Sequence, residues 1–241
     1  MLQAGVGYGA HPRQVLDIYR PTESSKAVVI FFYGGNWRSG SKDDYRFVAE
    51  SLTRQSLTVA IPDYRVFPEI RFPAFVDDGA RAVKAVREQV GAGTPIYLAG
   101  HSSGAHIAAL LALDARYLHA FGMEASRLAG FIGIAGPYDF LPFTSERTAE
   151  VFAGTSDLSQ TQPITFASRE APPTLLLHGT ADRTVLPRNS QNLAARLRSE
   201  GASTRLILYP ETEHVEILLA LSSVAQGDSR VLADLADFVA G

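Results

Sequence analysis

The chain contains no cysteine among its 241 residues. This absence excludes disulfide bonds, thiolate metal sites and a cysteine nucleophile. Positive charge is not in excess either, because 22 lysines and arginines stand against 25 acidic residues and leave a net charge of -3. The basic surface that binds nucleic acid is therefore not expected, and nucleic acid is not a predicted partner.

Long hydrophobic runs and metal-ligand patterns are also missing. No apolar stretch approaches the length of a membrane span, and the first residues, MLQAGVGYGAHPRQ, include no apolar signal-peptide region. We therefore expect a cytoplasmic protein without a membrane partner. Histidines and carboxylates nowhere cluster at the spacing of metal ligands, which disfavours a metal-dependent hydrolase, and no cofactor is expected. No pattern in the sequence indicates the oligomeric state.

What is present is an alternation of apolar extended segments with amphipathic helical segments. Several extended segments are apolar throughout, as in strands covered on both faces of a parallel sheet. This predicts an α/β fold, with a mostly parallel central sheet and helices on both faces, in a single domain over 1–241. The expected strands cover 15–19, 27–33, 57–61, 95–99, 130–135, 174–178 and 205–209, and the expected helices lie near 44–55, 75–90, 104–114, 189–200 and 229–240.

One stretch, 137–172, has no clear periodicity and is rich in proline. A segment of that length inside a compact domain is more often a lid or binding loop than a linker. We predict that it forms a small cap or pocket wall, to which Tyr138 and Phe140 contribute. Because it is short, we expect an open site for short acyl groups.

The segment PIYLAGHSSGAH at 95–106 carries the strongest functional signal. Its serine, Ser102, is flanked two residues away on each side by Gly100 and Gly104, between an expected strand and an expected helix. This spacing is typical of a sharp strand-to-helix turn that exposes a nucleophilic serine. The alternative is a serine in the tight turn of a nucleotide-binding type of fold.

A nucleophilic serine needs a base and a carboxylate, which in such sheets follow the carboxyl ends of strands. Asp182 follows the strand that ends at His178, and His214 follows the strand that ends at Tyr209. The order Ser102, Asp182, His214 is that expected for such an elbow. Four other carboxylates remain open as the acid: Asp139, Glu211, Glu213 and Glu216. The two histidines beside the serine, His101 and His106, are expected to pack or to support the site.

Donors for an oxyanion are expected from the Ser103 N–H, next to the nucleophile, and from the YGGNW loop at Tyr33 to Trp37. Adjacent glycines, Gly34 and Gly35, allow that backbone to turn its N–H groups toward a substrate. Trp37 and Tyr33 are further candidates for the pocket wall.

Together these motifs resemble the α/β-hydrolase superfamily, and within it the small carboxylesterases with an HGGxW-type oxyanion loop, a group that includes arylformamidases and some acetyl and feruloyl esterases. The resemblance covers nearly the whole chain, through LDIYRP, FYGGNWRSGSK, PDYRVFPEIRFP, GHSSGAH, GPYDF, LLLHGTADRTV and YPETEH. It implies Ser102 as nucleophile, Asp182 as acid and His214 as base. It also implies oxyanion N–H groups from Gly35, Asn36 and Ser103, and a scaffolding role for Tyr64, Arg65 and Asp77.

The chain departs from this group at two loop positions, where Tyr33 replaces the histidine before the glycines and Asn36 replaces a frequent third glycine. We expect the Tyr33 hydroxyl to tie down backbone; the alternative is a further oxyanion donor. The resemblance implies a serine carboxylesterase that cleaves small or short-acyl esters through an acyl-enzyme. An arylformamidase is the alternative, and a non-catalytic binding protein with the hydrolase fold is a third reading.

Overall fold

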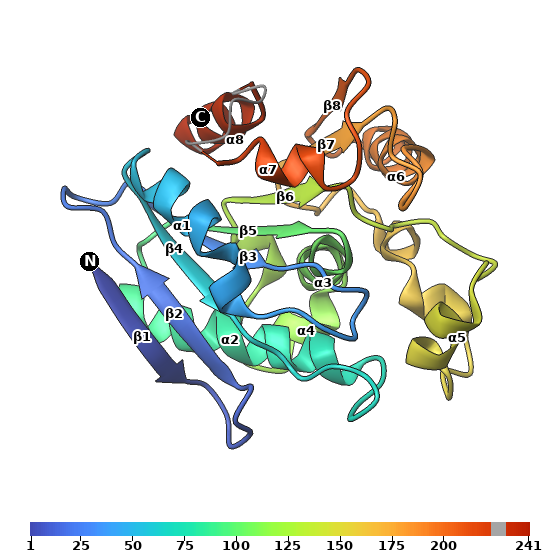
Figure 1. Cartoon of the computed structure of the whole chain (residues 1–241), viewed down its shortest axis with the longest axis horizontal. Helices are drawn as coiled ribbons and strands as arrows, with labels where there is room; N and C mark the ends of the chain where they lie inside the picture. Colours follow the sequence, from blue (N-terminus) through green and yellow to red (C-terminus); the bar gives the residue numbers. More distant parts are fainter. Residues whose placement is uncertain (223–229) are drawn as a thin grey trace.

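The computed structural model describes residues 1–222 and 230–241 and has an eight-stranded sheet at its centre (Figure 1). The strand order is β1-β2-β4-β3-β5-β6-β7-β8. The pairs β1–β2 and β2–β4 are antiparallel, and all other neighbours are parallel. The strands are β1 Leu2–Gly7, β2 Val15–Tyr19, β3 Ala27–Phe32, β4 Leu57–Pro62, β5 Ile96–His101, β6 Gly130–Ile134, β7 Thr174–Gly179 and β8 Thr204–Tyr209.

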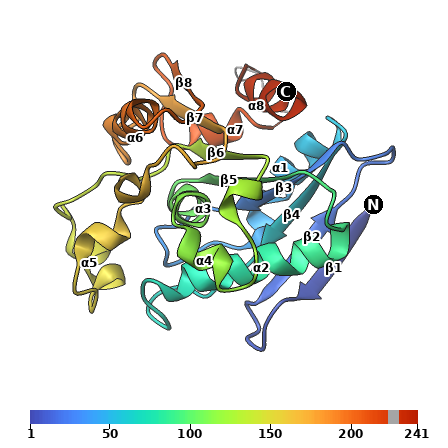
Figure 2. The same ribbon diagram turned by 180° about the vertical axis from the view of Figure 1, so that it is seen from behind.

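Helices cover both faces of the sheet, as Figures 1 and 2 show from opposite sides. Helices α1 and α8 contact each other on one face, and α2, α3, α4 and α6 lie on the other. The helices are α1 Arg46–Thr53, α2 Ala74–Val90, α3 Ser103–Leu113, α4 Ala115–His119, α5 Glu146–Phe152, α6 Arg188–Ser199, α7 Glu216–Leu219 and α8 Arg230–Ala240. Single 3-10 turns are η1 Lys42–Tyr45, η2 Ala125–Arg127, η3 Leu158–Thr161 and η4 Pro163–Phe166.

The core sits between the sheet and these helices. Every residue of β3, β4, β6 and β7 is buried, and so is every residue of α3. A strand buried on both faces has no polar alternation, and this continuous apolar pattern made it recognisable in the sequence. The predicted α/β class is confirmed, and the predicted strands differ from the observed ones by at most two residues at either end.

The antiparallel edge strand β1 was not predicted. Five of its six residues are exposed, so it lacks the apolar alternation that indicates a strand. It is held instead by pairing with β2, with an irregularity in register between Gln3 and Val6. The expected helix near 229–240 corresponds to α8, apart from position 229, which lies outside the described residues.

Candidate active site

Ser102 occupies a sharp turn between β5 and α3, with φ 55° and ψ -126°. A non-glycine residue at positive φ costs on the order of 1–3 kcal/mol, so packing must hold it there. A Cβ at Gly104 would lie 2.1 Å from the carbonyl oxygen of Phe32, and one at Gly100 would lie 2.5 Å from the backbone of Gly104. The two flanking glycines are therefore required by the close approach of helix α3 to strands β3 and β5.

The structure brings Ser102, His214 and Asp182 into one hydrogen-bonded line. The Nε2 atom of His214 lies 2.9 Å from the Ser102 Oγ, and its Nδ1 atom lies 2.6 Å from Oδ2 of Asp182. Ser102 follows β5, Asp182 follows β7 and His214 follows β8, so all three lie at the carboxyl edge of the sheet. Ser102 is 6% exposed, His214 is 9% exposed and Asp182 is 2% exposed, so the three residues are almost completely buried.

Asp182 is surrounded by hydrogen-bond donors. Its Oδ1 accepts from the backbone N–H groups of Thr184 and Val185, each at 2.9 Å. Its Oδ2 lies 3.2 Å from Nε2 of His178, which also donates to the carbonyl of Val185. Burial alone would raise the pKa of Asp182, but the donors from His178, His214 and Val185 outweigh burial and hold that pKa below its ordinary value. Asp182 therefore carries its charge beside Nδ1 of His214.

Two of the other candidate carboxylates accept hydrogen bonds from residues other than His214. Asp139 accepts from the side chain of Asn192 at 2.7 Å, and Glu216 accepts from the backbone of Glu213 at 2.8 Å. Among the candidate carboxylates, only Asp182 forms a side-chain contact with His214 in the described part of the chain.

His101 links the base to the loop that follows β3. Its Nε2–H donates to the backbone carbonyl of His214 at 3.0 Å. Its Nδ1 faces the hydroxyl of Tyr45 at 3.5 Å, and that hydroxyl accepts from the N–H of Gly34 at 3.0 Å. Burial and the neighbouring His214 lower the pKa of His101 to about 3, so it is neutral. One neutral ring thus joins the His214 backbone to the start of the glycine loop.

The glycine loop turns sharply beside the serine. Asn36 and Trp37 have φ of 54° and 58°, and Asn36 lines the same cavity as Ser102 and Ser103. Ser103 is the first residue of α3, so its N–H has no preceding helical turn to donate to. Gly35 does not line the cavity, which distinguishes it from the other two predicted oxyanion donors.

The cavity at Ser102 holds about 240 Å³. Its aromatic wall consists of Trp37, Phe140 and Phe143, with the Trp37 and Phe140 rings stacked at 6.0 Å. The indole N–H of Trp37 donates to Nδ1 of His106 at 3.2 Å, and Nε2–H of His106 donates to the carbonyl of Thr161 at 2.8 Å. The 137–172 segment therefore forms one wall of the cavity, and His106 fixes the ring that forms the other.

Two residues expected at the pocket wall lie elsewhere. Tyr33 is fully buried, its ring stacks on Tyr64 at 4.6 Å, and its hydroxyl accepts from Arg13 at 2.8 Å. Tyr138 is also fully buried, with its ring against Phe131 at 6.3 Å. Neither lines the cavity, because both rings point into the core. The Tyr33 hydroxyl binds a side chain that also donates to the Gly40 carbonyl, so Tyr33 braces the loop indirectly.

The scaffold around the loop also differs from expectation by one residue. The carboxylate that holds Arg65 is the fully buried Asp78, with its Oδ1 2.7 Å from Nη2 of Arg65, and not Asp77. Asp78 additionally accepts from Gln14 at 2.7 Å. Asp78 is among the buried residues of α2 and Asp77 is not, because successive side chains on a helix point in different directions and α2 turns Asp78 inward.

Three residues at the site were not assigned to it from the sequence. His178, in β7, is fully buried, and its Nε2 lies 3.2 Å from Oδ2 of Asp182. Arg183 and Arg188 line the cavity at Ser102. The signal for all three was their position in or just after the HGTADRTV segment, within six residues of Asp182.

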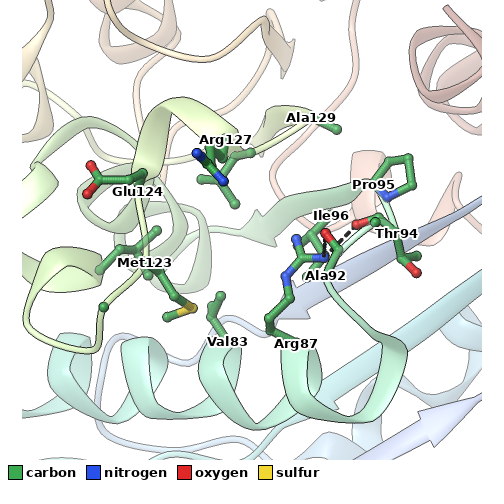
Figure 3. Close-up of a pocket in the computed structure, with 14 residues that line it drawn as sticks. Val83, Arg87, Ala92, Thr94, Pro95, Ile96, Met123, Glu124, Arg127 and Ala129 are labelled. Carbon is green, nitrogen blue, oxygen red and sulfur yellow. Dashed lines mark hydrogen bonds between the residues drawn. The ribbon is translucent and has the colours of Figure 1, made fainter.

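A second and larger cavity, about 800 Å³, lies at the opposite edge of the sheet, where β5 and β6 begin (Figure 3). It is lined by α2, by the loop before β5 and by the segment from Gly122 to Ala129. Arg87 reaches from α2 and donates to the carbonyls of Ala92 and Thr94 at 3.2 and 2.7 Å. No serine, histidine or aspartate is among the described residues that line it.

The sheet order, the elbow at Ser102 and the helices on both faces define an α/β-hydrolase fold. The BD-FAE family model matches residues 16–197, and the chain belongs to that family. A probable isoprenylcysteine alpha-carbonyl methylesterase of Oryza sativa subsp. japonica is 32% identical over 88% of this chain. The chain spans 58% of that relative's length.

Two further similarities support the fold and the family. A kynurenine formamidase of Danio rerio is 28% identical, over 88% of this chain and 74% of its own length. The structure of a truncated form of a carbohydrate esterase from gut microbiota superposes with a TM-score of 0.86 at 21% identity, covering 100% of this chain and 95% of that one. Within the described residues, no helix is long and apolar enough to cross a membrane.

Proposed function

We propose that this protein is a serine carboxylesterase that hydrolyses small carboxylic esters through an acyl-enzyme. The observation that carries the proposal is the line from Ser102 Oγ through the His214 ring to Asp182, with contacts of 2.9 and 2.6 Å. Because Nδ1–H of His214 is donated to a charged carboxylate, the lone pair of Nε2 faces the serine hydroxyl. The ring is therefore already oriented as a base.

In the proposed mechanism, His214 takes the Ser102 proton as the oxygen attacks the ester carbonyl. The N–H groups of Asn36 and Ser103 stabilise the oxyanion that forms. His214 then returns the proton to the leaving alcohol, which leaves the acyl group on Ser102. A water molecule, deprotonated by His214, repeats the attack, and the carboxylic acid departs as Ser102 regains its proton.

The test is hydrolysis of p-nitrophenyl acetate by the protein and by Ser102→Ala. We expect the variant to lose several orders of magnitude in kcat while its melting temperature stays close to that of the parent protein, since removing such a nucleophile leaves only binding and oxyanion stabilisation. A fluorophosphonate probe should label the parent protein and not the variant. Retention of more than a few per cent of the activity in a folded variant would exclude Ser102 as nucleophile.

The small cavity of about 240 Å³ supports a preference for short acyl chains. We expect kcat/KM for p-nitrophenyl esters to peak at about two to six acyl carbons, because each methylene left outside the cavity forgoes about 0.8 kcal/mol of burial. A rise that continues to palmitate would contradict this preference.

A second candidate is hydrolysis of an N-formyl aryl amide by the same residues. It is favoured by the similarity to the zebrafish kynurenine formamidase, of which the chain covers 74%. N-formylkynurenine assayed beside the esters separates the two, since a formamidase should turn it over faster than any ester in the series.

A further inference from the structure

The cavity at Ser102 carries charge of one sign. Two arginines, Arg183 and Arg188, are among the residues that line it, and no aspartate or glutamate is. The whole chain has a net charge of -3, so this positive lining runs against the overall balance. The cavity is thus locally cationic at the place where a substrate would lie.

Both arginines are available to a ligand. Their side chains are exposed, and neither forms a hydrogen bond or an ion pair with any residue that the structure describes. Arg38, on the nearby loop, is different: it pairs with Glu150 and donates to the carbonyl of Arg147. Its charge is already balanced by the protein.

Acidic residues of the adjacent 137–152 segment do not balance the two arginines either. Glu150 pairs with Arg38, and Asp139 accepts from Asn192. Glu146 begins α5 but does not line the cavity. The catalytic carboxylate, Asp182, is engaged by its own loop N–H groups and by two histidines.

Hydrogen bonds hold the backbone beside each of the two arginines. Arg183 directly follows Asp182, whose loop is fixed by the N–H groups of Thr184 and Val185. Arg188 begins α6, and its neighbour Asn189 is buried and accepts from two backbone N–H groups of the facing segment. Their backbones are therefore held at a defined place relative to the triad.

We infer that the preferred ester carries an anionic group, such as a carboxylate, on its acyl or alcohol part, and that Arg183 and Arg188 bind it while Ser102 attacks the ester carbonyl. A guanidinium fork forms strong, charge-assisted contacts with a carboxylate, and two such forks also orient it. This inference rests on the proposed esterase activity and specifies its substrate class. It identifies the arginines as residues that determine specificity.

The test uses matched neutral and anionic esters. Phenyl acetate and 4-acetoxybenzoate differ by a carboxylate on the alcohol side, and methyl hexanoate and monomethyl adipate differ by one on the acyl side. The readout is the ratio of kcat/KM for the anionic to the neutral ester, which cancels changes common to both. We expect Arg183→Gln with Arg188→Gln to lower that ratio about tenfold or more for one pair, which also identifies the side that the arginines contact.

Arg127→Gln is the matched control, because it removes an equal exposed charge from the cavity at the opposite edge of the sheet (Figure 3). It should leave both ratios unchanged. Raising salt from about 0.05 M to about 0.5 M should lower the ratio in the parent protein and not in the double variant, since exposed charges are screened.

The outcomes separate the two proposals. If the parent protein hydrolyses none of the esters, the esterase function itself fails. If it hydrolyses them but the double variant, shown to be folded by its melting temperature, leaves both ratios unchanged, the esterase function stands and the anionic specificity is overturned. The anionic specificity is also overturned if the double variant hydrolyses both esters of each pair more slowly by the same factor.

Discussion

The two cavities differ in volume and in the hydrogen-bond partners of their polar side chains. The one at the amino edge of the sheet is larger, about 800 Å³ against about 240 Å³, yet the guanidinium of Arg87 there is occupied with backbone carbonyls. The one at the carboxyl edge has a serine, a histidine and a carboxylate in line. Strand direction explains the difference, because loops leaving the carboxyl ends of parallel strands converge on one edge. The proposed active site is thus the smaller of these two cavities.

The largest expected effect that distinguishes the two cavities comes from Asp182, the proposed catalytic acid. Asp182→Asn should lower kcat by about 10⁴, because the amide favours the wrong tautomer of His214. The matched change at the other edge, Arg87→Met, should leave kcat unchanged. Steady-state kinetics with p-nitrophenyl acetate and circular dichroism of both variants make the comparison. Near-normal turnover by Asp182→Asn would remove Asp182 from the mechanism.

Acid should destabilise the protein through two histidines at the carboxyl edge, because burial lowers the pKa of both His101 and His106 and keeps them neutral. Burial lowers the pKa of His106 to about 4, against about 6.5 in an unfolded chain. Between those pH values the unfolded chain binds a proton that the folded protein does not, so the free energy of unfolding falls as pH falls. The slope is about 1.4 kcal/mol per pH unit for each such histidine.

Urea denaturation at several pH values between about 7 and 4.5 measures this slope. His106→Gln keeps a donor for Thr161 and an acceptor for Trp37 but cannot titrate, so its slope should be shallower by about 1.4 kcal/mol per pH unit. His101 remains in both proteins and contributes equally to each, with its pKa lowered to about 3. Identical slopes for the two proteins would show that His106 takes up its proton as easily folded as unfolded.

The smallest expected effect concerns Tyr33. Its hydroxyl binds Arg13 and its ring stacks on Tyr64, away from the cavity. Tyr33→Phe should therefore change kcat by less than about tenfold and cost roughly 0.5–1.5 kcal/mol of stability through the lost hydrogen bond. Kinetics and chemical denaturation of the one variant provide both values. A fall in kcat of about 10² to 10³ with unchanged stability would instead indicate an oxyanion donor.

The sequence predicted the features that produce a continuous apolar run or a motif of short, fixed spacing. Strands buried on both faces, the elbow at Ser102 and the strand-end positions of Asp182 and His214 all leave local patterns. Strand β1 leaves no such pattern, because five of its six residues are exposed and it is held mainly by pairing with β2.

The sequence pattern also did not predict side-chain orientations that depend on residues far away along the chain. Tyr33 is turned inward by Arg13, twenty positions away, and Asp78 rather than Asp77 meets Arg65 because of how α2 is rotated. Neither the Arg13 contact of Tyr33 nor the Arg65 contact of Asp78 has a periodic signature. For the same reason, the sequence did not predict that the ring of Tyr138 is buried in the core.

The hydrogen bond from His101 to the His214 backbone has a consequence for how the specificity of this protein could diversify. His101 contacts the backbone of His214, and His178 contacts Asp182. These two side chains are separate from the aromatic residues that form the outer wall, Phe140 and Phe143. Replacing the wall should therefore reshape the substrate range without loosening the reacting groups. Because the wall and the reacting groups are separate, the 137–152 segment is the part of the chain to exchange when a different substrate specificity is wanted.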